Sequence, residues 1–292
     1  MVNPLVSLVT VNFNEPEVTE QLLISINNNS YKNVEIIVVD NGCDRGVESL
    51  IESSYPEVKY IKSEENLGFA GGNNLGIEQA NGAFVFLVNN DTEFTDGLIE
   101  HLLARFSTQK DIGVVSPKIR YFNLPGVIQY AGYSKMNPFT ARNKAFGSKE
   151  KDEGQCDKAI ETPYGHGAAL MFKKELIEKV GLLPEVFFLY YEELDWCEQV
   201  RRAGYSIWYE PKALIYHKES VSVGKMSAFK TYYLTRNRIL FVRRNMSFLQ
   251  KIGFVVFFSL LTIPKNTLKM VLKAQWDHLK SFWSAIMWNL KN

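Results

Sequence analysis

Cysteines are scarce in this sequence, and a secretion signal is missing. The 292 residues include three cysteines, Cys43, Cys156 and Cys197, which are far apart and odd in number. This pattern does not suit a disulfide framework or a zinc ribbon, and it favours a reducing compartment. The first residues lack the basic stretch and apolar core of a signal peptide. We therefore expect a cytoplasmic protein.

Long hydrophobic runs are also scarce. Residues 252–263 form a run of 12 residues without a charge, and Pro264 follows it. A membrane-spanning helix needs about 20 apolar residues, so this run is predicted to be too short to span a bilayer. The remaining composition, with 46% hydrophobic and 22% charged residues, is that of an ordinary globular protein.

Acidic residues are rare in the last quarter of the chain. Residues 218–292 contain 13 Lys and Arg against 2 Asp and Glu, whereas residues 1–217 contain 20 against 30. A basic tail on an acidic body indicates an anionic partner, either nucleic acid or membrane phosphate. An amphipathic helix is predicted at residues 268–290, where apolar side chains recur every three or four positions. These are Leu272, Trp276, Leu279, Trp283, Ile286 and Leu290.

The tryptophans of this tail favour a membrane surface over nucleic acid, because their rings prefer the headgroup level. We predict peripheral attachment to the inner face of the cell membrane and no nucleic-acid partner. Packing of the tail on the rest of the protein, or a homodimer contact, is the alternative.

Apolar runs alternate with amphipathic stretches in the first third of the chain. Strands are predicted at residues 5–11, 34–39, 58–61 and 83–88, with helices at 18–26, 47–54 and 75–80. This order predicts an α/β fold with a mostly parallel sheet covered by helices on both faces. Residues 121–162 predict irregular loops and short strands, and later helices are expected at 170–183, 194–203 and 229–245.

Polar clusters follow three of the predicted strands, where ligands bind in such sheets. They are residues 12–14, 40–42 and 89–91. Asp91 could hold a divalent metal against a diphosphate, and Asp40 could accept hydrogen bonds from a nucleobase or ribose. Both sequences are also typical of turns, which is the alternative.

Residues 65–76 are rich in glycine but match neither a P-loop nor a dinucleotide fingerprint. The glycines would let the backbone approach a ligand closely, or would simply form the entry to a helix. The lack of a fingerprint after the first strand argues against a Rossmann oxidoreductase.

Two carboxylates, Glu192 and Glu193, begin a predicted helix after the aromatic residues 187–191. One of them could be a general base beside a sugar-binding aromatic surface. Stabilisation by the helix dipole is the simpler explanation. His217 follows a strand and suits either a metal ligand or a structural histidine.

Taken in order, these motifs resemble inverting glycosyltransferase family 2, which has the GT-A fold, and most of all its rhamnosyltransferase-like branch. The resemblance covers about residues 5–245. It implies a catalytic domain at 1–228, with a nucleotide-binding half at about 1–117 and an acceptor half at about 118–228. Residues 229–292 would form a helical, basic and amphipathic extension. The motifs that carry the resemblance are residues 9–14, 38–41, 66–73, 89–91, 165–171, 181–185, 192–195 and 217.

The resemblance also implies roles for single residues. A nucleotide-sugar donor would be bound by Thr10, Asn12, Asn14, Asp40, Asn66, Gly68 and Asn90. Mg²⁺ or Mn²⁺ would be held by Asp91 and His217. The acceptor would meet Gly165, His166, Gly167, Ala168 and Asp195. Glu193 would be the general base, with Glu192 as the alternative.

Two positions depart from the family pattern: Asn89 and Glu193 stand where many relatives have Asp. The implied reaction is inverting transfer of a sugar to a saccharide, lipid-linked by preference, in bacterial surface polysaccharide synthesis. dTDP-L-rhamnose is the preferred donor. The alternatives are a UDP-hexose transferase of the same fold, or a relative that binds nucleotide sugars without catalysis.

Overall fold

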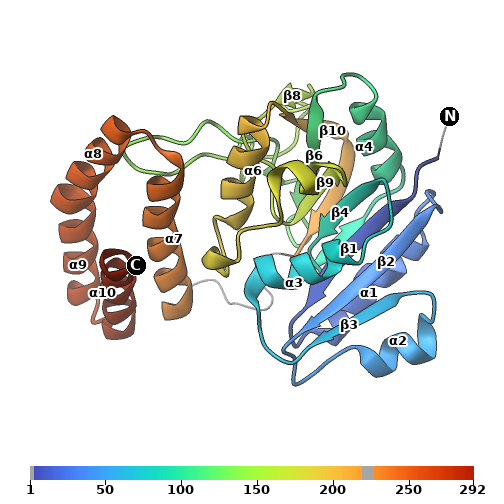
Figure 1. Ribbon diagram of the computed structural model, residues 1–292, viewed down its shortest axis with the longest axis horizontal. Helices are drawn as coiled ribbons and strands as arrows, with labels where there is room; N and C mark the ends of the chain where they lie inside the picture. The colour runs from blue at the N-terminus through green and yellow to red at the C-terminus, as the bar shows by residue number, and fades with distance from the viewer. Residues whose placement is uncertain (1–2, 219–226) are drawn as a thin grey trace.

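The computed structural model describes residues 3–218 and 227–292. One mixed sheet runs through the molecule, and a group of C-terminal helices lies beside it (Figure 1). The strand order along the sheet is β3-β2-β1-β4-β9-β6-β10-β5, with β7 paired to β6 and β8 paired to β10.

The first four strands are parallel and confirm the predicted βα alternation. They are β1 (Val6–Asn12), β2 (Val34–Asn41), β3 (Lys59–Ser63) and β4 (Phe84–Val88). The intervening helices are α1 (Pro16–Asn27), α2 (Glu48–Ser54) and α3 (Gly68–Glu78).

The second half of the sheet is mixed. Its strands are β5 (Thr92–Phe94), β6 (Ile112–Tyr121), β7 (Ile128–Tyr130), β8 (Ile160–Glu161), β9 (Ala169–Lys173) and β10 (Ser206–His217). The helices here are α4 (Leu98–Phe106), α5 (Leu176–Val180), the 3₁₀ turn η1 (Glu185–Phe187) and α6 (Glu192–Arg202). The helix predicted at 170–183 is therefore wrong. β9 lies between β4 and β6 and is buried on both faces, so its continuous apolar run has no strand period.

Two hydrophobic cores lie on opposite faces of the sheet, since neighbouring residues of one strand point to opposite sides. On β1, Leu8 packs with α1, α2 and α4, whereas Val9 packs with α3 and α6. Both side chains are almost fully buried.

Helix α3 explains the glycine-rich stretch. A Cβ at Gly76 would overlap Val9, and one at Gly68 would overlap the carbonyl oxygen of Phe188. Gly68 also has φ of 72°, a left-handed conformation that favours glycine. These glycines let the helix approach β1 and let a later loop approach the helix.

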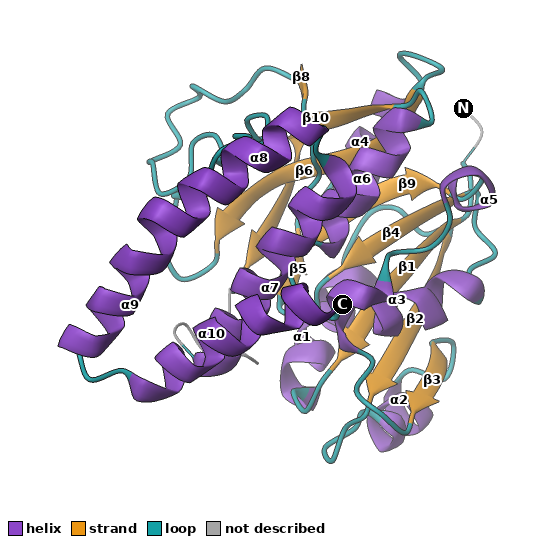
Figure 2. Ribbon diagram, turned by 60° about the vertical axis from the view of Figure 1, so that its left-hand side comes forward, coloured by secondary structure: helices purple, strands orange, loops and turns teal. Residues whose placement is uncertain are grey.

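The C-terminal extension is a bundle of α7 (Ala228–Asn245), α8 (Phe248–Phe257), the π-helical turn η2 (Phe258–Thr262), α9 (Ile263–Leu272) and α10 (Trp276–Lys291). Figure 2 shows α8 and α9 as one long rod, with α10 turning back from its far end toward α7. Phe254 and Phe258 of the rod pack with Phe282 and Ile286 of α10 in a third hydrophobic cluster.

The extension differs from the predictions in two respects, the uninterrupted helix at 268–290 and the length of the apolar segment. Pro264 does not end the helix, because it lies in the first turn of α9, where a missing N–H is tolerated. The helix predicted at 268–290 is interrupted before Trp276, where Ala274 has φ of 50°. The rod Phe248–Leu272 has 25 residues, and by length and composition alone it could cross a membrane. The prediction of a segment too short to span is thus corrected, although this feature by itself is weak evidence for spanning.

Candidate active site

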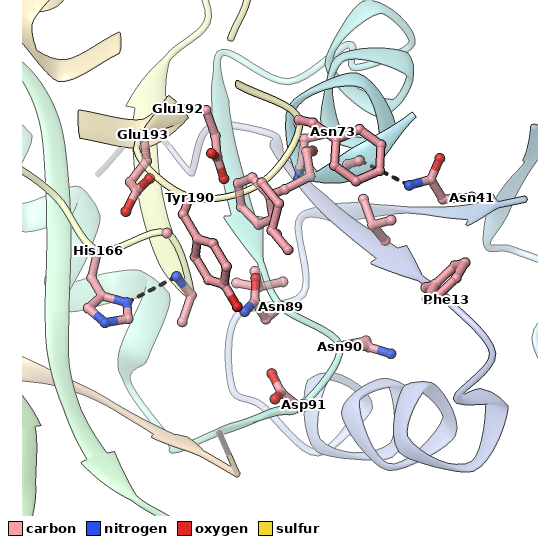
Figure 3. A pocket seen from close by; sticks show the side chains of 18 of the residues that line it. Phe13, Asn41, Asn73, Asn89, Asn90, Asp91, His166, Tyr190, Glu192 and Glu193 are labelled. Atoms are coloured by element: carbon pink, nitrogen blue, oxygen red, sulfur yellow. Dashed lines mark hydrogen bonds between the residues drawn. The ribbon is translucent and has the colours of Figure 1, made fainter. Parts of the chain in front are cut away.

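A cavity of about 440 Å³ opens at the carboxyl ends of β1 and β4 (Figure 3). It brings together ten of the residues that the sequence indicated, drawn from five separate segments of the chain. These are Asn66, Gly68, Asn90, Asp91, His166, Gly167, Ala168, Glu192, Glu193 and His217.

Asp91 and His217 meet because β5 and β10 are antiparallel and pair Thr92 with His217. Nε2 of His217 lies 3.0 Å from Oδ1 of Asp91. Nδ1 lies 2.8 Å from Oε1 of Gln129. A glutamine oxygen only accepts hydrogen bonds, so in the neutral ring Nδ1 carries the proton and Nε2 presents its lone pair.

This pair fits a divalent cation. Oδ1 of Asp91 is buried and has no hydrogen-bond partner, although Nε2 of His217 is at ion-pair distance. A lone pair of Asp91 Oδ1 and the lone pair of His217 Nε2 therefore face each other, as two ligands of one metal ion would. Within residues 3–218 and 227–292, no group of three or more His, Cys, Asp or Glu gathers into a metal site. A cation here would draw its other ligands from water and a diphosphate, as Mg²⁺ usually does.

Glu192 and Glu193 reach the cavity from the start of α6. Burial, and secondly repulsion by Glu193, raise the pKa of Glu192 well above its ordinary value. Burial raises the pKa of Glu193 to about 7, against the opposing effect of backbone N–H groups. One oxygen of each carboxylate is buried without a hydrogen-bond partner. Glu193 is thus the more readily ionised of the two and is suited to accept a proton near neutral pH.

A strained loop holds these carboxylates in place. Phe188, Tyr190 and Tyr191 have φ of 63°, 69° and 76°, which is costly for residues with side chains. Asn237 of α7 stabilises the loop: its amide donates to the carbonyls of residues 187, 189 and 190 at 2.7–2.8 Å. Arg236 donates to the carbonyls of residues 186 and 187 at 2.7 and 2.6 Å.

His166 forms part of the cavity wall near Glu193. Its Nδ1 accepts a hydrogen bond from the Ala168 N–H at 3.1 Å, so Nε2 carries the proton. Burial, and secondly the nearby His217, lower the pKa of His166 to about 3. The ring stacks on Tyr133, with centroids 6.0 Å apart. A neutral, fixed imidazole of this kind can donate a hydrogen bond to a hydroxyl.

Four predicted donor residues do not line the cavity, and the structure uses three of them internally. Nδ2 of Asn12 donates to Oδ1 of Asp40 at 2.7 Å. Oδ2 of Asp40 accepts from the Val47 N–H at 2.8 Å and from the Tyr60 hydroxyl at 2.9 Å. Oδ1 of Asn14 accepts from two N–H groups of the 44–45 turn. Thr10 is buried, and its hydroxyl has no partner.

Two predicted acceptor residues also lie outside the cavity. Asp195 is fully buried and makes two hydrogen bonds to Arg244, at 2.9 and 3.0 Å. The expected acceptor contact is therefore corrected: the carboxylate ties α6 to α7. Gly165 is buried, and a Cβ there would overlap Leu170.

Sequence reasoning missed several residues of the site. Gln129 orients His217, Tyr133 stacks on His166, and Lys230 lies over the cavity residue Tyr190, with its Nζ 5.5 Å from the ring centre. Gln129 and Tyr133 come from the irregular segment 121–162, where no local pattern marks a functional residue.

The chain is similar to known glycosyltransferases. The family model described as Glycosyl transferase family 2 matches residues 7–181. The hexosyltransferase Agl10 of low-salt glycan biosynthesis in Haloferax volcanii is 26% identical over 239 residues, which are 80% of this chain and 74% of that protein. The N-acetylglucosaminyl-diphospho-decaprenol L-rhamnosyltransferase of Mycobacterium tuberculosis is 25% identical over 240 residues, which are 75% of this chain and 77% of that protein.

Solved structures share the fold at lower identity. The mannosyltransferase PcManGT of Pyrobaculum calidifontis, solved with GDP-Man and Mn²⁺, has a TM-score of 0.63 at 15% identity, covering 99% of this chain and 88% of that one. The S. aureus TarS fragment 1-349 with UDP-GlcNAc has a TM-score of 0.62 at 15% identity, covering 96% of this chain and 80% of that one. The fold, the cavity at the strand ends and the family match agree: this chain is a member of glycosyl transferase family 2.

Proposed function

We propose that the protein transfers a sugar, with inversion, from a nucleoside diphosphate donor to a saccharide hydroxyl. One observation carries the proposal: a single cavity holds a pair suited to a metal, Asp91 and His217, and a carboxylate suited to accept a proton, Glu193. Figure 3 shows Asp91 and Glu193 at opposite ends of the cavity, with Tyr190 between them. A sugar diphosphate could therefore lie with its phosphates near Asp91 and its anomeric carbon toward Glu193.

Each residue then has a defined task. Asp91 and His217 would hold Mg²⁺ or Mn²⁺, which when bound offsets the charge of the departing diphosphate. Glu193 takes the proton from the acceptor hydroxyl, and His166 donates a hydrogen bond that orients a hydroxyl. The acceptor oxygen attacks the anomeric carbon from the face opposite the diphosphate, which inverts the configuration.

Glu192 has a different task from Glu193. Burial, and secondly the charge of Glu193, raise the pKa of Glu192 and favour its protonated form, so in this proposal it acts as a hydrogen-bonding group rather than a base. This assigns the base to Glu193 and leaves Glu192 to shape the cavity.

For the donor we propose dTDP-L-rhamnose, with UDP-hexoses as the alternative. The rhamnosyltransferase relative supports the first, and the hexosyltransferase relative supports the second. For the acceptor we propose a saccharide on a polyprenyl diphosphate used in surface polysaccharide synthesis, because the same rhamnosyltransferase is named for such an acceptor.

We further propose that residues 1–228 are the catalytic domain and that residues 229–292 attach it to the cytoplasmic face of the membrane. The support is the number of exposed apolar side chains on the rod and α10. We call it the apolar face. Its members include Leu249, Val255, Val256, Leu260, Leu261, Leu268, Leu272, Trp276 and Leu290.

A donor screen tests the reaction. The full-length protein is incubated with Mn²⁺, a polyprenyl diphosphate-linked sugar and each nucleotide sugar in turn, and the released nucleoside diphosphate is measured. Release with dTDP-L-rhamnose and formation of an elongated lipid supports the proposal. Binding of a nucleotide sugar without any turnover would instead identify a non-catalytic relative.

A further inference from the structure

A hairpin connects the cavity with the apolar face. Residues 133–145, here called the connecting hairpin, are joined by bridges between Tyr133 and Ala145 and between Asn137 and Arg142. At one end, Tyr133 stacks on His166 in the cavity wall. Near the other end, Phe139 packs so closely on α8 that a Cβ at Gly253 would lie 2.9 Å from its ring.

An arginine without an acidic partner lies beneath this hairpin. Arg238 of α7 is 6% exposed, and its Nε donates to the carbonyl of Thr140 at 2.6 Å. Its guanidinium carbon lies 5.6 and 5.2 Å from the ring centres of Phe254 and Phe258. Across residues 3–218 and 227–292, no carboxylate lies at ion-pair distance from it, and its terminal nitrogens make no hydrogen bond.

A second cation stands next to it. Arg142, on the connecting hairpin two residues after Thr140, is exposed, and its side chain makes no hydrogen bond or ion pair to any described residue. Burial, and secondly the charge of Arg142, lower the pKa of Arg238 to about 10. The fold thus places a buried guanidinium near an exposed one, and an anion that contacted both would offset their repulsion.

The pair also lies close to the catalytic carboxylate. The hydroxyl of Tyr191 donates to the carbonyl of Ala141 at 2.9 Å, beside Arg142. Burial raises the pKa of this tyrosine to about 12, against the opposing effect of both arginines, and Glu193 adds to the rise. The arginines therefore stand between the apolar face and the base.

We propose that Arg142 and Arg238 bind the diphosphate group of a membrane-tethered acceptor. This inference rests on the proposed function, and it adds the site that holds the acceptor. Guanidinium groups suit phosphate oxygens because they donate pairs of parallel hydrogen bonds. The polyprenyl chain would leave along the apolar face, and the sugar would point toward Glu193. A purely structural role in anchoring the hairpin would explain the hydrogen bond from Arg238 to the carbonyl of Thr140. It would leave Arg142 without a role.

The test compares two acceptors that carry the same sugar, one on a polyprenyl diphosphate and one on an alkyl chain without phosphate. The full-length wild type is measured beside Arg142→Gln and Arg238→Lys, which keeps the buried charge and protects folding. Lys110→Gln, an exposed cation between α4 and β6, is the control. We expect the ratio of kcat/KM for the diphosphate acceptor over the phosphate-free one to fall about tenfold or more in Arg142→Gln. The control should leave this ratio within about twofold.

A flotation assay with vesicles of anionic phospholipid, without acceptor, distinguishes the two sources of phosphate, which are the acceptor and the lipid headgroups. A fall in the ratio with unchanged flotation supports the proposal. An unchanged ratio overturns it, and if flotation is then lost, the arginines bind lipid headgroups instead. If the wild type uses neither acceptor, the proposed function fails first, and this is seen without any variant.

Discussion

Oδ1 of Asp91 lies 3.0 Å from Nε2 of His217, and the opposite ring nitrogen lies 2.8 Å from Oε1 of Gln129. Gln129 thereby decides which nitrogen of the ring carries the proton. With that tautomer, two acceptor atoms face each other, which is unfavourable until a cation separates them. The three residues come from β7, the end of β10 and the turn before β5, so the arrangement depends on the sheet.

The first prediction concerns this group. EDTA should abolish transfer, and Mn²⁺ or Mg²⁺ should restore it. Asp91→Asn should lower kcat by about 10²-fold or more, because the diphosphate charge would no longer be offset. Gln129→Leu should weaken Mn²⁺ binding by about 10- to 100-fold, the usual effect of losing a group that orients a metal ligand. Titration of Mn²⁺ in the presence of the nucleoside diphosphate measures both variants, and full activity in EDTA would contradict the metal role.

The second prediction separates the two glutamates. Glu193→Gln keeps the shape of the side chain and removes the base, so kcat should fall by about 10²-fold or more. Glu192→Gln resembles the protonated acid already present, so its loss should be below about tenfold. Both variants should bind the donor as the wild type does, which calorimetry can verify. A reversed order of the two losses would show that Glu192 is the base.

The third prediction is the pH dependence of the rate. The base must be ionised to act, and burial raises the pKa of Glu193 to about 7. kcat/KM should therefore increase as the pH rises through about 7 and level off above it. In Glu192→Gln this limb should remain, because burial is the largest cause of the raised pKa of Glu193. A rate that is flat from pH 5 to 8 would be inconsistent with this assignment.

The fourth prediction concerns stability. Because Glu192 has a raised pKa in the folded state, the folded protein holds more protons than the unfolded chain above about pH 4.5. The free energy of unfolding therefore decreases as the pH rises through that window, and Glu192→Gln removes the part of the decrease that is due to Glu192. The Tm of this variant should exceed that of the wild type at pH 8, by roughly 2–4 °C per kcal/mol, and the gain should shrink at pH 5. Glu52→Gln on the exposed side of α2 should show no such trend.

The fifth prediction tests the apolar face. Leu260 and Leu268 are 69% and 60% exposed, so replacing both with Gln should not disturb the core. Flotation with anionic vesicles should weaken by about tenfold or more, since each leucine loses its burial in the interface. Leu124→Gln, a residue 53% exposed outside the extension, is the matched control. If the double variant floats as the wild type does, the face has another role, such as contact with a second copy.

Deletion of the extension would be a poorer test of the membrane role. α10 packs on α7 through Phe282 and Ile286, and the side chain of Asn289 donates to the carbonyl of Arg236 at 3.0 Å. The ring of Trp288 lies 4.7 Å from the guanidinium carbon of Arg236. Removing α10 would therefore loosen the residues that hold the catalytic loop, and activity would fall for reasons unrelated to the membrane.

The N-terminal strands and helices were predictable because each strand is a short apolar run and each following helix has a helical periodicity of apolar residues. β9 was not, because a strand buried on both faces loses its alternation. The course of the chain at Pro264 was also beyond prediction, since a π-helical turn before the proline depends on packing by Phe258.

At the site, sequence motifs predicted the residues that reach the cavity from strand ends and from the start of α6. They could not show that Asp40 and Asp195 are occupied internally, since those partners are set by the fold. Nor could they show Gln129 or Asn237, whose roles arise from residues distant in sequence.

The bonds from Asn237 to the catalytic loop also set an order of events during synthesis. The chain leaves the ribosome from its N-terminus, so β1 to β4 and the proposed metal ligand Asp91 are complete long before α7 appears. The left-handed conformations of Phe188, Tyr190 and Tyr191 need the amide of Asn237, some 47 to 50 residues later, to hold them. A nascent chain could therefore fold its nucleotide-binding half before its base is in position. Such a half-made enzyme would not activate water against a bound donor, and turnover would begin only once the helices of the C-terminal extension had been made.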